Sequence, residues 1–426
     1  MTDEPTTDAD SAEFDSAELE APQATPLLAP ADGVPELAVT TDQILSAAEL
    51  LASGHGPFAI DAERASGFRY SNRAYLVQIR RAGAGTVLID PVNHGESATM
   101  VMAPVADVLD TDEWVLHAAD QDLPCLAELG MRPPALYDTE LAGRLAGFQR
   151  VNLATMVSEL LGLQLTKGHG AADWSKRPLP DEWLNYAALD VEVLLELRDA
   201  IAAVLEEQGK TDWAAQEFEH LRTYTAAPTR RDRWRRTSGI HKVRSPRALA
   251  AVRELWLTRD DIARRRDIAP GRILPDAAII NAATTDPDTI EKLTALPVFG
   301  GSRQRRSAHV WLEALDRARN SEDPPESAEA PNGPPPPSRW ARRKPEAAAR
   351  LEAARAGLAA LSERVNVPAE NLVTPEVVRR LCWDWEPVGD TAAQIEDFLV
   401  EAAVRPWQRQ LVVPVLTAAL APAGGA

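Results

Sequence analysis

The sequence predicts a layered α/β or α+β domain in the first half of the chain and a helical second half. Between residues 40 and 205, four short apolar segments alternate with stretches whose apolar residues recur at helical spacing. From residue 241 onward the helical spacing dominates, and a Pro-rich stretch at residues 320–345 divides it into two blocks. Strands mixed with helices in one span are typical of a layered domain, whereas sustained helical periodicity indicates helices packed on one another.

The layered domain is predicted to begin with a helix and to continue as a group of strands. Residues 42–53 carry apolar residues at helical spacing, with Thr41 as the expected cap and Gly54 as the expected stop. Stretches that contain Gly or Asn separate the first three strands, which favours antiparallel neighbours. The strands are expected at "PFAID" (57–61), "YLVQIRR" (75–81), "TVLID" (86–90) and "EWVLHAA" (113–119).

Helices are expected to complete this domain. A helix around residues 100–109 precedes the fourth strand, and another at 121–130 precedes the segment "ALYDT". Further helices follow to residue 161, and a loop punctuated by Gly and Pro leads into a long helix at residues 183–205.

The helical second half has two blocks that share local features. Each block opens with an amphipathic helix, followed by "DIAPGRIL" in the first block and "NVPAENLV" in the second. The hypothesis is a divergent repeat of one small domain. The segment between them, "NSEDPPESAEAPNGPPPPSRWARRKP", is rich in Pro and is predicted to be an extended linker.

Composition places the protein among reduced, non-membrane proteins. With 426 residues, of which 45% are hydrophobic, the chain can form about three domains. The two cysteines, Cys125 and Cys382, cannot make a disulfide framework and suit a reducing compartment. We see no apolar run long enough to span a membrane and no signal peptide, so we expect a cytoplasmic protein with no membrane partner.

The net charge of −19 argues against a nucleic-acid partner until its distribution is considered. Residues 1–40 hold ten acids and no Lys or Arg, so they are expected to form a disordered tail. Residues 229–244 read "TRRDRWRRTSGIHKVR", a dense basic cluster that can attract a polyanion locally. The predicted organisation is a tail (1–40), a layered domain (41–210), a basic connector (211–240), a helical domain (241–319), a linker (320–345) and a second helical domain (346–426).

Acidic residues follow the predicted strands in a pattern that indicates a metal site. Asp61 and Glu63 lie two residues apart on one strand, so both side chains leave the same face. Asp120 and Asp122 follow the fourth strand, and Asp190 lies one helical turn after Tyr186. Carboxylates that gather in this way repel each other unless a cation joins them, and oxygen ligands suit Mg²⁺ or Mn²⁺. Two such ions about 4 Å apart can act on a phosphodiester.

Each acid also has an ordinary structural explanation when it is considered alone. Acids at strand ends are commonly solvated, and Asp120 or Asp122 can simply cap the helix that follows. Tyr186 can be a core residue whose hydroxyl reaches water, and Asp190 can be a surface acid. The order and spacing of the whole set are more specific than any single member.

That order resembles the DEDD superfamily of 3′–5′ exonucleases, tyrosine subgroup, and most closely the ribonuclease D family. The matching motifs are D-x-E at Asp61 and Glu63, H-x-x-x-x-D-L from His117 through Asp122, and Y-x-x-x-D from Tyr186 to Asp190. Supporting stretches are "YLVQI", "LIDP", "LYDTELA" and "TKGHGAADWSKRPL". The two helical blocks resemble the helicase-and-ribonuclease-D C-terminal (HRDC) domain, the second block more weakly than the first.

The resemblance implies an RNase H-like fold with a mixed five-stranded sheet, and an active site with two divalent metal ions, Mg²⁺ or Mn²⁺. Asp122 fits the family spacing from His117, and Asp120 does not. By family roles Tyr186 would orient the attacking water. The implied metal ligands are Asp61, Glu63, Asp122 and Asp190.

The implied activity is that of a 3′–5′ exoribonuclease, expected to be a monomer, that releases nucleoside 5′-monophosphates from tRNA precursors or other structured RNA. The alternatives are a DNA-directed exonuclease and a nucleic-acid-binding protein that works through its helical domains. All five active-site residues are present, which favours a working enzyme, and no polymerase segment follows the exonuclease region.

Six further residues are weaker candidates for contact with the substrate. Each of them has a structural alternative that is at least as common, such as packing, a solvated loop charge or a place in an interdomain connector. Arg233 and Trp234 together suit contact with the nucleic-acid backbone plus base stacking. The six are Gln78, His117, Lys167, Arg177, Arg233 and Trp234.

Overall fold

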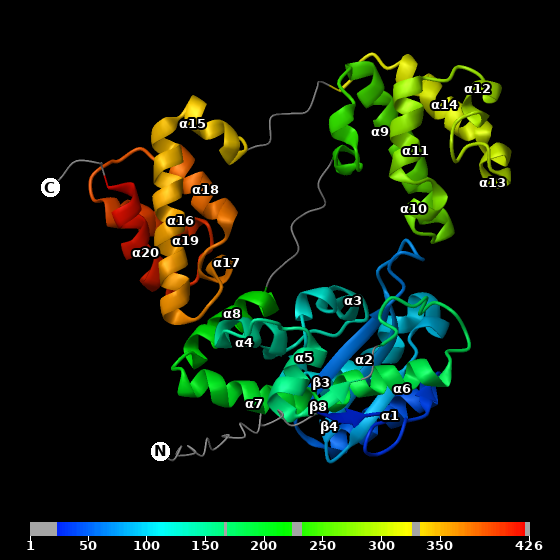
Figure 1. Ribbon diagram of the computed structural model, residues 1–426. Coiled ribbons are helices and arrows are strands. Elements are labelled where there is room, and N and C mark those ends of the chain that lie inside the picture. Colours follow the sequence, from blue (N-terminus) through cyan, green and yellow to red (C-terminus); the bar gives the residue numbers. More distant parts are fainter. Residues whose placement is uncertain (1–23, 166–167, 224–231, 326–332, 422–426) are drawn as a thin grey trace, which may run out of the picture.

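The computed structural model describes residues 24–165, 168–223, 232–325 and 333–421 (Figure 1). A layered domain is followed by two helical domains, so the predicted fold class is confirmed. Among the described residues, no helix is both long enough and apolar enough to cross a membrane.

The central sheet has six strands in the order β2-β5-β4-β3-β6-β7. The predicted antiparallel arrangement is confirmed, because β3 pairs with β4 and β4 pairs with β5 in that sense. The parallel pairs at both ends make the sheet mixed, as expected, with one strand more than the five implied by the resemblance. The strands are β2 (Leu37–Ala38), β3 (His55–Arg64), β4 (Ala74–Ala82), β5 (Gly85–Ile89), β6 (Trp114–Leu116) and β7 (Leu136–Asp138).

The extra strand comes from residues that were predicted to be tail. β1 (Thr25–Leu27) pairs in parallel with β8 (Leu163–Leu165), and β2 lies at the edge of the main sheet beside β5. The prediction of a disordered tail is therefore wrong for residues 25–38, because these short apolar segments find strand partners on the folded domain. Residues 1–23 lie outside the described part of the chain.

Alternation along β3 divides its side chains between two cores. Phe58 and Ile60 pack against α1 (Thr41–Ser53) and α2 (Ala98–Leu109). Ala59 faces the other side, where α6 (Asp181–Glu192) and α7 (Leu194–Glu207) pack. Because Asp61 and Glu63 share the parity of Ala59, both acids face α6.

Two of the predicted helices differ from the structure in their ends. The cap of α1 is Thr40, whose hydroxyl accepts the Gln43 amide at 3.3 Å, one residue before the expected cap. The long helix predicted at residues 183–205 is broken at Val193 into α6 and α7. The break lets α6 cross β3 while α7 packs on α4 (Thr139–Ala146) and α5 (Leu153–Leu161).

The predicted basic connector begins with a folded helix. α8 (Thr211–Thr223) buries Phe218 against Tyr137 of β7, with ring centroids 4.6 Å apart. The prediction of a connector is therefore wrong for residues 211–223, because this helix carries apolar residues that complete the exonuclease core. Residues 224–231 lie outside the described part.

The helical domains repeat the same order of elements. In the first domain, the 21-residue helix α9 (Pro246–Arg266) is followed by α10 (Pro270–Ile273) and α11 (Asp276–Thr285). In the second, the 21-residue helix α16 (Pro345–Val365) is followed by α17 (Ala369–Leu372) and α18 (Pro375–Asp384), which have the same lengths as α10 and α11. Both long helices end at a residue in the left-handed region, Asp267 and Asn366. This match in lengths and caps supports the hypothesis of a divergent repeat.

Further helices complete both domains. The first domain adds α12 (Ile290–Thr294), α13 (Ser302–Arg306) and α14 (Ala308–Arg319). The second comprises α15 (Trp340–Arg343), α16, α17 (Ala369–Leu372), α18 (Pro375–Asp384), α19 (Thr391–Glu401) and α20 (Pro406–Leu420).

The end of the predicted linker belongs to the second helical domain. Trp340 of α15 is fully buried, and its indole N–H donates to the Pro335 carbonyl at 2.6 Å. Arg379 of α18 donates to the Pro334 carbonyl at 2.9 Å. The prediction of an extended linker is therefore wrong near its end, because a buried Trp anchors it to the domain.

Candidate active site

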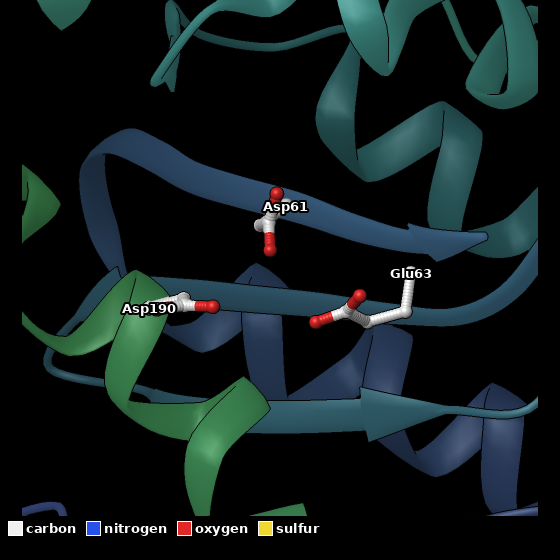
Figure 2. Close-up of side chains that lie close together, drawn as sticks. All are labelled: Asp61, Glu63 and Asp190. Carbon is white, nitrogen blue, oxygen red and sulfur yellow. The ribbon is translucent and has the colours of Figure 1, made fainter. Parts of the chain in front are cut away.

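Three carboxylates from two elements converge beside the sheet. Asp61 and Glu63 leave the same face of β3, and Asp190 reaches toward them from α6 (Figure 2). One carboxylate oxygen from each of the three lies within 4.8 Å of the others. Within the described residues these three form a group that can hold a metal ion, as predicted from the strand and helix spacing.

Asp122 lines the same pocket. It directly precedes α3 (Leu123–Glu128), is buried, and lies close enough to donate a hydrogen bond to Asp61 in its protonated form. Its carboxylate also lies 3.5 Å from Nε of Arg64. Asp120 is exposed and does not line the pocket. The geometry thus places Asp122 with the other three acids, and Asp120 outside the group.

The four carboxylic acids are held in an environment that disfavours their charge. Burial is the main cause that raises the pKa of Asp61, of Glu63 and of Asp190, and neighbouring carboxylates raise the last two further. Burial, with the charge of Asp61 next, raises the pKa of Asp122 to about 8. Without a cation the site therefore retains protons near neutral pH.

The residues that line the pocket suit a divalent cation. Among the described residues that line the pocket, Arg64 is the one Lys or Arg side chain against four carboxylic acids. Carboxylate oxygens are the ligands that Mg²⁺ and Mn²⁺ prefer. A cation would favour the deprotonated forms that burial now opposes, so the residues present fit a divalent metal.

Tyr186 lies one turn before Asp190 on α6 and lines the same pocket. Burial first, and the charges of Asp190 and Glu63 next, raise the pKa of its hydroxyl above the ordinary value. The phenol therefore stays protonated at neutral pH and can donate a hydrogen bond, but it cannot serve as a base.

A glycine lets the loop that precedes α6 pass over the Tyr186 ring. A Cβ added to Gly168 would lie 1.6 Å from Cε2 of Tyr186, so this position requires glycine. Trp174, from the same loop, is fully buried with its ring centroid 6.5 Å from that of Tyr186. The loop thus fixes the tyrosine ring against the pocket.

Gln78 of β4 holds the Asp61 carboxylate by a hydrogen bond. It lies opposite Asp61 in the β3–β4 register, is fully buried, and donates from Nε2 to Oδ2 of Asp61 at 2.9 Å. The prediction that Gln78 contacts substrate is therefore wrong, because its side chain is enclosed and holds the Asp61 carboxylate in place.

Two further predicted substrate contacts also prove to be structural. Arg177 makes two hydrogen bonds to buried Asp90, at 2.6 and 2.9 Å, and donates to the Tyr75 carbonyl at 2.8 Å. This network occupies the guanidinium and excludes phosphate. Trp234 is 3% exposed and packs in the core of the first helical domain, so no base can stack on it. Both predictions are wrong for the same reason: the side chain is already engaged.

The other three candidates have different outcomes. His117 lines the pocket, its Nδ1 lies 2.9 Å from the Thr139 hydroxyl, and burial lowers its pKa to about 4, so it is neutral. Arg233 is exposed, with its guanidinium 5.5 Å from the Trp256 ring centroid, and substrate contact by His117 or Arg233 stays a prediction. Lys167 lies outside the described residues.

Arg64 lines the pocket, and sequence reasoning did not name it as a candidate. It ends β3, directly after Glu63, and its side chain is 26% exposed at the pocket. Its position directly after the D-x-E motif was visible in the sequence. An arginine at the end of a strand is usually solvated, so this position alone does not predict that the side chain lines a pocket.

The fold and the convergent acids define a 3′–5′ exonuclease, and comparisons with known proteins agree. Residues 37–206 match the "3'-5' exonuclease" family, residues 248–315 the "HRDC domain" and residues 333–420 the "3' to 5' exonuclease C-terminal domain". The HRDC match covers the first helical domain, and the second helical domain matches the exonuclease C-terminal family.

Relatives of known name narrow the class. Ribonuclease D of Granulibacter bethesdensis is 32% identical over 67% of this chain and 72% of that relative. Ribonuclease D of Gluconacetobacter diazotrophicus is 31% identical over 83% of this chain and 87% of that relative. The chain belongs to the ribonuclease D family.

Solved structures extend the likeness to the whole architecture. A protein from Bifidobacterium adolescentis is 36% identical, covers 93% of this chain and 99% of its own, and has a TM-score of 0.85. Escherichia coli RNase D, at 24% identity, covers 92% of this chain and 99% of its own with a TM-score of 0.65, which shows the shared fold.

Proposed function

We propose that this chain is a 3′–5′ exoribonuclease that uses divalent metal ions to trim structured RNA, such as tRNA precursors, from the 3′ end. The observation that carries the proposal is the convergence of four carboxylic acids, two buried and two half-buried, and one tyrosine in a single pocket. Membership of the ribonuclease D family supports RNA as the substrate. Two ions, Mg²⁺ or Mn²⁺, suit a set of four acids.

Asp61, Glu63, Asp122 and Asp190 would hold the metal ions. Divalent ions held there would polarise the phosphate and lower the pKa of water, so that water could attack near neutral pH. A water oxygen bonds to the terminal phosphorus, the bond from phosphorus to the 3′ oxygen breaks, and that oxygen takes a proton. The products are a nucleoside 5′-monophosphate and an RNA that is one nucleotide shorter.

Two other residues of the pocket act on substrate and water. Tyr186 donates its proton in a hydrogen bond and so orients the attacking water, since its raised pKa excludes a role as base. Arg64 contacts the non-bridging oxygens of the terminal phosphate. Its ion pair with Asp122 is long, at 3.5 Å, so the guanidinium can turn toward an anion that enters the pocket.

The direct test follows the length of labelled RNA in time. The purified chain, with Mg²⁺ or Mn²⁺, is given a 5′-labelled RNA whose 3′ end carries either a hydroxyl or a bulky block. We expect a ladder that shortens from the free 3′ end, and no change in the blocked RNA. A DNA of the same sequence tests the alternative substrate. Internal cuts in the blocked RNA, or faster loss of DNA than of RNA, would contradict the proposal.

A further inference from the structure

The loop between β3 and β4, residues 65–73, makes several of its backbone hydrogen bonds with another domain, in addition to those of the Phe68 and Arg69 amides to the Ala65 carbonyl within the loop. The amides of Tyr70 and Ser71 donate to Oδ1 of Asp267, at 3.1 and 2.9 Å. On the same loop, the Phe68 carbonyl accepts the Ala269 amide at 3.0 Å. Buried backbone groups need such partners, so the first helical domain completes the folding of this loop.

Asp267 makes this contact from the C-terminal end of α9, where it directly follows Arg266. It caps that helix at φ 47°, in the left-handed region that Asp tolerates better than most residues. Its second carboxylate oxygen accepts the Tyr75 hydroxyl at 3.3 Å. One carboxylate thus fixes the loop and the first residues of β4.

A neighbouring arginine reinforces the contact. Nε of Arg272 donates to the Gly67 carbonyl at 2.7 Å. Its guanidinium also lies 4.1 Å from the Phe68 ring centroid. The 65–73 loop is therefore held by Asp267 at the end of α9 and by Arg272 of α10.

The 65–73 loop is connected both to the strand that carries Asp61 and Glu63 and to the segment that covers Tyr186. It begins directly after Arg64 and so continues the strand that carries Asp61 and Glu63. β3 pairs with β6 at Phe58 and Ala59, before the acids begin, so the end of β3 depends on β4 and on this loop. The loop also sends Nε of Arg69 to the Ser175 hydroxyl at 2.8 Å, on the segment that covers Tyr186.

We propose that Asp267 of the first helical domain is a positioning residue for the exonuclease site. By fixing the 65–73 loop it sets the place of the β3 carboxylates and of the segment over Tyr186. The first helical domain then contributes to turnover itself, in addition to any binding of RNA. The inference rests on the proposed exonuclease function.

The second helical domain provides an internal comparison. Asn366 occupies the same place at the end of its long helix, and its Nδ2 donates to the Ala146 carbonyl at 3.3 Å. Both domains therefore dock on the exonuclease domain through the left-handed cap of their long helix. Asn366 contacts the end of α4, whereas Asp267 contacts the loop that continues the catalytic strand.

The test measures kcat and KM on a trinucleotide RNA, which isolates turnover from the capture of long RNA. For Asp267→Ala we expect kcat to fall roughly ten- to hundredfold, because small displacements of reacting groups cost rates of this order. KM should stay near that of the wild type. Asp267→Asn keeps an oxygen acceptor and tolerates the left-handed backbone, so it should recover most of the loss.

Asp286→Ala is the matched control. Asp286 caps α11 in the same left-handed conformation, at φ 48°, and pairs with Arg319 inside the domain. The substitution imposes the same backbone strain away from the loop, and kcat should not change. Hydrogen exchange of the Tyr70 and Ser71 amides, which Asp267→Ala should accelerate, reports whether the loop contact is lost.

Each outcome separates the two proposals. A wild-type chain that degrades no RNA refutes the proposed function. A wild type that is active, with Asp267→Ala exchanging its loop amides faster at unchanged kcat, overturns the positioning role. Unchanged exchange in that variant overturns it as well. If Asp267→Ala does not fold, Arg272→Ala removes the Gly67 contact instead, and unchanged kcat there has the same meaning.

Discussion

At the scale of single residues, the site combines acids that burial keeps from ionising with a tyrosine that stays protonated. The two arginines near the pocket differ in the same physical way. Arg177 donates to Asp90 and to three carbonyl groups, whereas Arg64 has one long ion pair with Asp122 and one hydrogen bond to Gln121, at 3.4 Å. A guanidinium with unused hydrogen-bond donors can bind a substrate, whereas one whose donors are all engaged by the protein stabilises the fold.

Tyr186→Phe should lower single-turnover cleavage by roughly 10²–10⁴, the scale of a positioned proton-transfer group. The ring and its packing remain, so metal affinity by calorimetry and RNA affinity should stay close to wild type. Unchanged cleavage would mean that Tyr186 is a core aromatic. Loss of metal binding would mean that it supports the ligands.

Arg64→Gln should reduce kcat/KM on RNA by roughly 10- to 100-fold, since a hydrogen bond to a charged group is worth about 1.5–3 kcal/mol. Arg144→Gln is the matched control, because Arg144 pairs with Glu140 on the helix surface and does not line the pocket. Equal activity of the two variants would remove Arg64 from the mechanism.

At the scale of elements, the local patterns were reliable where one physical rule decides the outcome. Alternation along β3 predicted that Asp61 and Glu63 share a face, and the helical turn predicted that Tyr186 and Asp190 do. The break at Val193 was not predictable, because it serves packing between elements distant in sequence. Trp234 was misjudged for the same reason: its basic neighbours indicated a surface, and tertiary packing buried it.

Metal binding should depend on pH through the raised pKa values. Folding raises the pKa of Asp122 to about 8, so the metal-free folded state holds a proton that the unfolded chain releases at lower pH. These acids therefore make the metal-free protein less stable as pH rises from about 4 to about 8. A bound cation needs the deprotonated forms, so it should counter that loss.

The measurement is the melting temperature with and without Mn²⁺, at about pH 6 and about pH 8. The increase caused by Mn²⁺ should be larger at the higher pH, and Asp61→Asn should reduce it. An increase that is equal at both pH values, or equal in the variant, would place the ion elsewhere.

At the scale of the whole molecule, the first helical domain gives the strongly acidic chain a cluster of exposed arginines. Arg265 and Arg266 of α9 and Arg303 of α13 line one hollow on the first helical domain. The basic cluster near Trp234 first indicated where RNA would bind, but the indole that was to stack on bases is buried. The arginines of the hollow are exposed and suit a phosphate backbone better.

Changing Arg266 and Arg303 together to Gln should weaken binding of a tRNA precursor and lower the slope of log affinity against log salt by about two, one for each lost phosphate contact. Turnover of a trinucleotide should not change. Arg317→Gln, which breaks a pair with Glu254 in the same domain, is the control. An unaltered salt slope would exclude this surface from RNA binding.

The central claim, that the four-acid pocket cleaves RNA, is tested most directly by Asp61→Asn beside Asp120→Asn. The second change removes an exposed acid outside the pocket and should leave cleavage intact. With 5′-labelled RNA and saturating Mn²⁺, we expect Asp61→Asn to abolish the ladder. Its melting temperature in metal-free buffer should not fall, since burial already opposes the charge of Asp61. Cleavage by Asp61→Asn within roughly one order of magnitude of the wild-type rate would contradict the account, because the loss of a metal ligand should lower the rate by more than that.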